Sequence, residues 1–255
     1  MIVKGTNIKT KSELLNLARE LGNPANQLAI VSEGNVSTAV DEETFIVKAS
    51  GTHLRTLTED QFVQVRFERI LPMLEQEFNQ TEIHETLLAS RVDPRALKPS
   101  VETIFHAWLL RQRGVKFVGH VHPEEVNKIL CSNHSKDFAE KRLFPDEIVC
   151  CGRKSLLIEY TDPGLKLAVA IKHKWNQFLE ENGFSPVLIL LQNHGVIAVG
   201  PTAKAVLATS LMAAKAARIF VGACAMGDPL FMSPEEVDRI QTRVDEHYRQ
   251  QLLRN

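Results

Sequence analysis

Two histidines two residues apart, His120 and His122, follow the apolar run 115–118. Side chains at positions i and i+2 of a strand lie on the same face of a sheet, so these imidazoles are expected side by side. A third histidine, His194, follows another apolar run, 187–191. Three neutral imidazoles with an open fourth position are typical of a catalytic zinc site, and manganese or cobalt would accept the same ligands.

A glutamate, Glu102, opens a predicted helix directly after the segment 99–101. Its carboxylate could act as an acid or base near a metal, or it could be a first-turn glutamate stabilised by the helix dipole. Two small polar loops, 34–37 and 50–52, lie next to predicted strands. Backbone N–H groups and hydroxyls in such loops can hold a phosphate, although on their own both segments are ordinary turns.

The bulk properties indicate a globular protein of ordinary composition. The chain has 255 residues, of which 44% are hydrophobic and 24% charged, and its formal net charge is −1. This balance gives no reason to expect nucleic acid or a membrane surface as a partner, and no apolar stretch approaches the ~20 residues of a membrane span. The start, 1–13, lacks an apolar core of signal-peptide length, and the cysteines show no C-x-x-C spacing. We therefore expect buried, reduced thiols and a cytoplasmic location.

The elements that position these residues follow from hydrophobic periodicity and turn residues. Besides the strand that leads into His120, strands are predicted at 28–31, 44–48, 63–67, 147–151, 155–160, 187–191 and 196–199. Helices are predicted at 12–22, 68–90, 101–113, 124–131, 162–183, 203–226 and after a capping box at 233–236. Hairpins interleaved with helices predict one α/β domain, residues 1–255, with a mixed sheet and helices on both faces.

Five short segments in a fixed order resemble the class II aldolase/adducin family. Each is weak alone, but the ordered set is specific and extends over about residues 12–220: Gly34-Asn35-Val36-Ser37, Ser50-Gly51-Thr52, Pro99-Ser100-Val101-Glu102, His120-Val121-His122-Pro123 and Asn193-His194-Gly195-Val196. Segments 160–164 and 245–249 look like the aldolase half of bacterial rhamnulose-phosphate aldolase/dehydrogenase proteins. Because no dehydrogenase half accompanies them in this sequence, we expect a stand-alone aldolase.

The resemblance implies a three-layer α/β/α fold with a central mixed, largely antiparallel sheet, and a homotetramer with sites between subunits. It implies a zinc-dependent aldolase, similar to fuculose-phosphate aldolase, that cleaves a ketose 1-phosphate to dihydroxyacetone phosphate and an aldehyde through an enediolate. It implies zinc held by His120, His122 and His194, with Glu102 as acid/base and Tyr160 as proton donor to the aldehyde oxygen. The phosphate site that it implies involves Asn35, Ser50, Gly51 and Ser100.

The phosphate site departs from the family pattern at one position. Many members have two serines before the glutamate, whereas here the second position is Val101. Either the phosphate is held by fewer contacts, or the substrate differs. Lys98 could supply compensating charge or be an exposed loop lysine.

Other functions use the same three histidines. In the family these are 4-epimerisation of pentulose phosphates, dehydration and decarboxylation. Epimerases replace the acid/base glutamate, so Glu102 favours an aldolase, and the complete histidine set argues against a non-catalytic adducin-like scaffold. His106, one helical turn after Glu102, is expected either to line the site or to pack within the helix layer. Surface positions are expected for the remaining histidines without a partner pattern, namely His84, His134 and His173.

Overall fold

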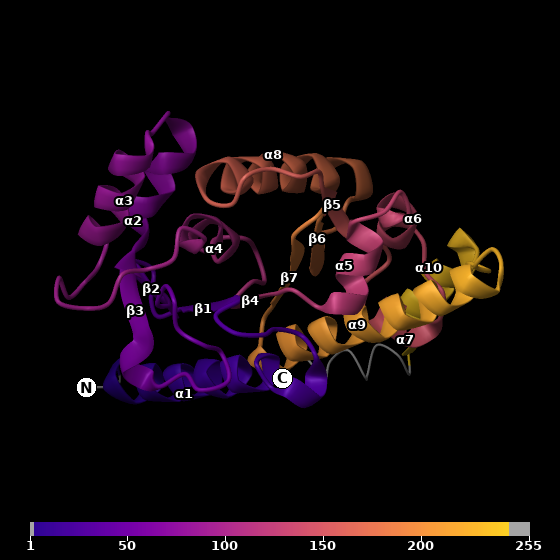
Figure 1. Cartoon of the computed structure of the whole chain (residues 1–255), viewed down its shortest axis with the longest axis horizontal. Coiled ribbons are helices and arrows are strands. Elements are labelled where there is room, and N and C mark those ends of the chain that lie inside the picture. The colour runs from indigo at the N-terminus through magenta and orange to yellow at the C-terminus, as the bar shows by residue number, and fades with distance from the viewer. Residues whose placement is uncertain (1–2, 245–255) are drawn as a thin grey trace.

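The computed structural model describes residues 3–244 and places a seven-stranded sheet between two layers of helices (Figure 1). The strands are β1 (Asn35–Ala39), β2 (Thr44–Lys48), β3 (Phe62–Arg66), β4 (Phe117–Val121), β5 (Leu156–Ile158), β6 (Leu188–Leu191) and β7 (Gly195–Gly200). Their order in the sheet is β3-β2-β1-β4-β7-β6-β5. Only the β5–β6 pair is parallel among these strands. The predicted three-layer architecture with a mixed, largely antiparallel sheet is confirmed.

One face of the sheet is covered by five helical elements, which are α2 (Phe67–Ile70), η3 (Leu71–Glu75), α3 (Gln80–Ala89), α4 (Thr103–Leu109) and α8 (Leu165–Asn182). Here Val118 and Val199 of the sheet belong to the same buried cluster as Trp108 of α4 and Trp175 of α8. The two indole rings meet edge to face at 5.9 Å, a favoured aromatic geometry. This packing fixes α4, whose N-terminus carries Glu102, against the centre of the sheet.

The opposite face is covered by a second helical layer, which comprises α1 (Val3–Leu21), α5 (Glu124–Leu130), α6 (Ser135–Glu140), α7 (Pro145–Cys151) and α9 (Ala203–Met226). Leu14 and Leu21 of α1 pack with Val121 of the sheet and Ala213 of α9 in this layer. The last helix, α10 (Pro234–Thr242), packs on α7. Two short 3-10 turns are η1 (Pro24–Asn26) and η2 (Glu59–Gln61).

Helix α9 is long and apolar enough, by length and composition alone, to cross a membrane. The expectation that no apolar stretch approaches that length is therefore wrong. The helix lies along the sheet in Figure 1 and buries small side chains, among them Ala213 and Ala217, against β4, β7 and α1. Its apolar composition serves the core of this domain.

Two predicted strands are wrong. Residues 28–31 form a turn, in which Val31 has a left-handed φ of 50° and the Glu33 carboxylate accepts a backbone hydrogen bond. The first strand is instead β1, whose polar side chains obscure the apolar alternation. Residues 147–151 lie in α7, which begins at Pro145 with two acidic residues in its first turn. Those are helix-start features that the following apolar run masked.

Some helix boundaries also differ from prediction. The helix predicted at 68–90 is divided into α2, η3 and α3, and Asn79 caps the last of these. Helix α8 begins after Gly164 rather than at Asp162. Helix α4 is shorter than the helix predicted at 101–113. The helix predicted at 12–22 extends back to Val3 as α1. The other predicted elements agree closely, including the capping box at Ser233-Pro234-Glu235-Glu236.

The four cysteines are free thiols. Cys151 is buried, but Cys150 and Cys224 are partly exposed and Cys131 is exposed. The expectation of buried thiols therefore holds only for Cys151.

Candidate metal centre

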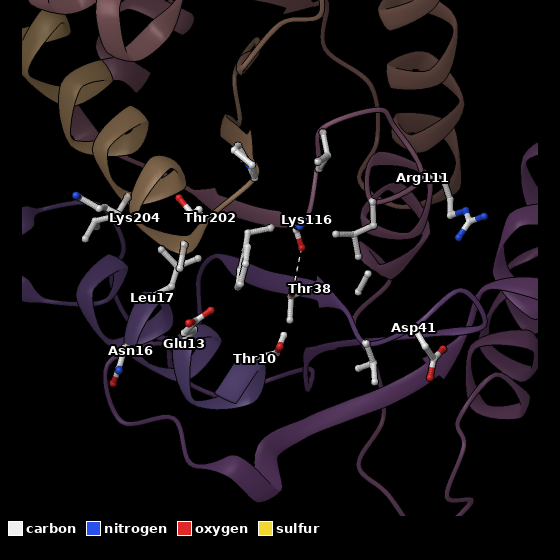
Figure 2. Close-up of a pocket in the computed structure, with 18 of the residues that line it drawn as sticks. Thr10, Glu13, Asn16, Leu17, Thr38, Asp41, Arg111, Lys116, Thr202 and Lys204 are labelled. Carbon is white, nitrogen blue, oxygen red and sulfur yellow. Dashed lines mark hydrogen bonds between the residues drawn. The ribbon is translucent and has the colours of Figure 1, made fainter. Parts of the chain in front are cut away.

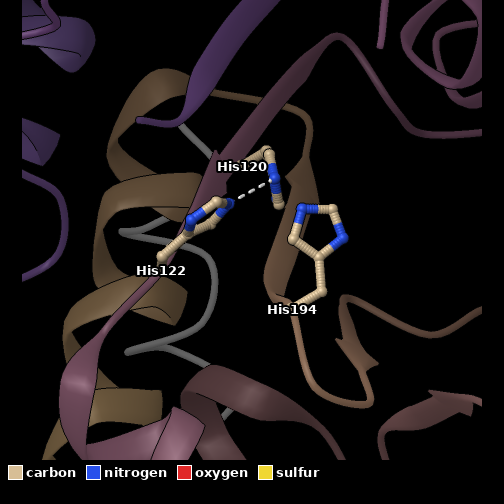
Figure 3. A group of neighbouring side chains, drawn as sticks. All are labelled: His120, His122 and His194. Carbon is tan, nitrogen blue, oxygen red and sulfur yellow. Dashed lines mark hydrogen bonds between the residues drawn. The ribbon is translucent and has the colours of Figure 1, made fainter. Parts of the chain in front are cut away.

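Three histidines converge at the carboxyl end of β4, as Figure 3 shows. His120 belongs to β4, His122 follows it directly, and His194 lies in the turn between β6 and β7. Because β7 pairs with β4, this turn is brought beside the end of β4. One nitrogen from each ring lies within 4.8 Å of the corresponding nitrogens of the other two. The Nε2 atoms of His120 and His122 are 2.9 Å apart. The three form a group that could hold a metal ion.

The hydrogen bond of His120 fixes which of its nitrogens is available. The ring is fully buried, and its Nδ1 atom lies 2.9 Å from the carbonyl oxygen of Val196. An N–H at Nδ1 satisfies that carbonyl, so Nε2, when it carries no proton, is the atom that can bind a cation. This is the second contact that metal-binding histidines commonly make, so the donor set fits a divalent cation such as zinc.

The His194 turn is held by its own contacts. Asn193 adopts a left-handed φ of 56°, and its N–H donates to the carbonyl of Leu130. The side-chain amide of Asn127 donates to the carbonyl of His194 at 3.1 Å. These two bonds tie the turn to α5 and so position His194.

Glycine is required directly after His194. A Cβ atom on Gly195 would lie 2.6 Å from both the His122 ring and the carbonyl oxygen of Val121, closer than any real Cβ contact. We therefore expect Gly195→Ala to push the His122 ring aside and to weaken zinc binding about 10–100-fold, the effect typical of a disturbed ligand. Chelator competition measures this. Gly222→Ala, whose added methyl has open space in α9, is the matched control and should bind zinc normally; equal affinities in the two variants would contradict the argument.

Glu102 lies beside the three-histidine group. It is the N-cap residue of α4, and its Oε1 atom lies 3.2 Å from Nε2 of His120 and 3.8 Å from Nε2 of His194. Burial alone would raise the pKa of Glu102, but the facing imidazoles, His120 above all, hold it well below its usual value. The group is therefore a carboxylate at neutral pH, placed where a carboxylate can accept a proton.

The electrostatics keep most of the histidines neutral. Burial, with smaller contributions from the neighbouring imidazoles, lowers the pKa of His122 to about 3 and that of His194 to about 4. Burial also disfavours protonation of His120, but the adjoining Glu102 carboxylate raises the pKa of His120 overall. Neutral imidazoles are the form that binds metals, so His122 and His194 need lose no proton at pH 7.

Sequence reasoning missed a lysine beside the site. Lys48, at the end of β2, is 2% exposed, and its Nζ atom donates to the carbonyl of Thr52 at 2.7 Å. Burial lowers the pKa of Lys48 to about 8, partly offset by the charge of Glu102. A lysine that ends an apolar strand two residues before Ser50 was the available sequence signal.

The predicted loop 50–52 meets the loop that carries Ser100, whereas most of the other predicted loop, 34–37, belongs to strand β1. The Ser50 N–H donates to the carbonyl of Lys98 at 2.9 Å, and the Ser100 hydroxyl accepts from the N–H of Glu102 at 3.3 Å. Ser50 and Gly51 are exposed, and Gly51 has a left-handed φ of 75°. The loops therefore lie together next to the start of α4.

The structure relates Asn35 and Tyr160 to the three histidines through strand register and a backbone hydrogen bond. Asn35 is buried as the register partner of His120, and its side-chain oxygen accepts from the N–H of Val36. The Tyr160 side chain is 57% exposed, and its backbone N–H donates to the side chain of Gln192, two residues before His194. Its catalytic role stays a prediction, and the segment 245–249 lies outside the described residues.

A separate cavity of about 840 Å³ lies at the other end of the strands (Figure 2). It is lined by α1, the β1–β2 turn and the start of α9, with Thr38, Lys116 and Thr202 among its residues. The described residues around it include no histidine or cysteine. The described part of its lining therefore offers no ligand set comparable to the three-histidine group.

Comparison with known proteins agrees with this geometry. A sequence model described as the class II aldolase and adducin N-terminal domain matches residues 12–221. The chain belongs to this family. Membership indicates an enzyme of the lyase or epimerase type, and class II aldolases are typically dependent on a divalent metal.

Individual relatives are more distant. The chain is similar to a Bacillus subtilis protein named uncharacterized oxidoreductase YuxG, at 26% identity over 64% of this chain and 21% of that protein. Its fold is similar to that of an L-fuculose 1-phosphate aldolase, with a TM-score of 0.70 and 18% identity over 91% of this chain and 94% of the other. The N-terminal class II aldolase domain of a Thermoplasma acidophilum protein gives a TM-score of 0.65 and 23% identity over 82% and 92% of the two chains. These likenesses show the fold.

Proposed function

We propose that this protein is a zinc-dependent aldolase that cleaves a ketose 1-phosphate, such as rhamnulose or fuculose 1-phosphate, to dihydroxyacetone phosphate and an aldehyde. The observation that carries the proposal is the position of Glu102, with one carboxylate oxygen 3.2 Å from Nε2 of His120. A scaffold has no need of an ionised, largely buried carboxylate beside three imidazoles. We further propose that the chain works as a single-domain homotetramer in the cytoplasm.

A divalent cation held by His120, His122 and His194 would supply Lewis-acid stabilisation for negative charge on substrate oxygens. The protein must then move protons. In cleavage, the C3–C4 bond of the ketose breaks, the C4 hydroxyl loses a proton as it becomes the aldehyde, and C3 of the three-carbon product gains one. Glu102 is assigned the proton transfer at carbon, because it is a carboxylate in contact with the metal position. Tyr160 is assigned the proton at the aldehyde oxygen.

The phosphate end of the substrate is assigned to the meeting loops. Ser50, Gly51 and Ser100 offer hydroxyls and backbone N–H groups there, and buried Lys48 supplies a nearby cation. Val101 stands where many family members have a serine, so one hydroxyl contact is lost. A charged contact from Lys48 can take its place. Lys98, the other lysine that could supply a charge here, is exposed and contributes its backbone carbonyl to the loop contact.

Activity on defined sugar phosphates tests the proposal. The zinc-loaded protein should release dihydroxyacetone phosphate from rhamnulose 1-phosphate or fuculose 1-phosphate, and a coupled assay for that product measures it. Ribulose 5-phosphate serves as the competing substrate, because an epimerase would convert it without breaking a carbon–carbon bond. Inactivity on both deoxyhexulose phosphates would refute the substrate class, and conversion of ribulose 5-phosphate alone would favour an epimerase.

A further inference from the structure

His106, in α4, is buried with only one of its ring nitrogens satisfied. The residue is 0% exposed, and its Nδ1 atom lies 2.7 Å from the hydroxyl of Ser37 in β1. Its Nε2 atom is buried without a hydrogen-bond partner. Buried polar atoms nearly always have a partner, so an orphaned nitrogen in a packed layer points to a group that reaches it in another state of the protein.

Glu102 is the acceptor best placed to be that group. It stands four residues before His106, a spacing that puts both side chains on one face of the helical segment. The two groups also interact electrostatically: His106 lowers the pKa of Glu102, and the charge of Glu102 acts to raise the pKa of His106. In the present arrangement Glu102 contacts Nε2 of His120 instead.

That contact with His120 is incompatible with an occupied metal site. Because Nδ1 of His120 is bonded to the Val196 carbonyl, Nε2 is the atom left for a cation. A nitrogen whose lone pair binds a cation carries no N–H with which to hold Glu102. A cation at the three-histidine site therefore removes the hydrogen-bond donor that His120 offers to Glu102. The Glu102 carboxylate then needs another donor.

We propose that His106 is a positioning residue for Glu102, donating a hydrogen bond from Nε2–H to the Glu102 carboxylate whenever a cation occupies the three-histidine site. In this proposal the Ser37 hydroxyl donates to Nδ1, which places the single ring proton of His106 on Nε2. Burial lowers the pKa of His106 to about 3, so the ring is neutral and has only that proton to offer. The inference rests on the proposed function for the cation and for the role of Glu102.

Nitrogen-15 spectra of histidine side chains test the hydrogen bond without any substrate. The full chain is compared with and without Zn²⁺, and we expect zinc to move the Nε2–H signal of His106 downfield and to slow its exchange with water. Glu102→Ala should remove this change while the zinc-bound signals of His122 and His194 persist. A His106 signal that zinc leaves unmoved, or that moves equally in Glu102→Ala, overturns the proposal.

Zinc affinity supplies a second measurement. His106→Phe keeps a ring that can stack on Phe105, as the imidazole does at 4.6 Å, but removes both nitrogens. Chelator competition should show zinc bound about 10–100-fold more weakly, with partial recovery in His106→Gln, whose amide can still donate. His84→Phe, on the exposed surface of α3, is the matched control. Unchanged affinity in a folded His106→Phe protein overturns the proposal, and if that variant does not fold, the spectra of the wild-type chain decide.

The outcomes separate this inference from the proposed reaction. Zinc binding without cleavage of any sugar phosphate would refute the aldolase activity and leave the hydrogen bond to be judged by the spectra. A wild-type chain that binds no zinc would refute both.

Discussion

Glutamine in place of Glu102 should lower the turnover of a sugar phosphate about 10²–10⁴-fold, the usual contribution of a positioned acid or base. The reason is that the amide has nearly the size of the carboxylate but cannot accept the proton that must move at carbon. Because Glu102 is not one of the three histidine ligands, zinc should stay bound. The measurement is turnover at saturating substrate together with the zinc content of the same preparation.

The control for this variant is Glu85→Gln, which changes the same side chain at an exposed position of α3 and should leave turnover unchanged. A Glu102→Gln protein that is fully loaded with zinc and turns over at a near-normal rate would show that another group moves the proton. Loss of zinc from the variant would instead show that Glu102 is needed to hold the metal.

The fold was predictable where apolar periodicity is undisturbed. Helix α9 and strand β2 match their predicted bounds: the buried residues of α9 recur at helical spacing, and β2 is a short, largely apolar run that is buried throughout. Strand β1 was missed because Asn35, Ser37 and Thr38 place polar side chains at buried positions. Their cost is offset by tertiary partners, such as the Lys116 carbonyl for Thr38, which no local pattern reveals.

In the candidate site, too, local patterns were predictable and tertiary partners were not. The histidine pair was visible because a strand's two-residue period is a local property, and the Asn193-His194-Gly195 turn was visible because its hairpin is local. The partners of these residues come from elsewhere in the chain. Glu33 lies with Oε1 3.8 Å from Nδ1 of His122, although the segment before it was predicted to be a strand. Lys48 and the Ser37–His106 pair likewise depend on how β1, β2 and α4 are packed.

The strongest effect is expected from removing the central ligand. His120→Ala should abolish zinc binding and reduce turnover to background, because His120 is the fully buried member of the set and contacts both other imidazoles and Glu102. Treating the wild-type chain with a chelator should have the same effect on turnover, and added zinc should restore the wild type alone. His84→Ala, at an exposed position, should behave as the wild type does.

Thermal unfolding measures the loss of zinc binding in His120→Ala without any substrate. A ligand that binds only the folded state stabilises it by about 2.7 kcal/mol at 100 times its dissociation constant. For a chain of this length each kcal/mol shifts the Tm by about 2–4 °C, so saturating zinc should raise the wild-type Tm by roughly 5–10 °C. The His120→Ala protein should show no such rise, although its own Tm starts lower because the vacated space in the packed sheet is destabilising. An equal zinc-induced rise in both proteins would place the metal somewhere other than these histidines.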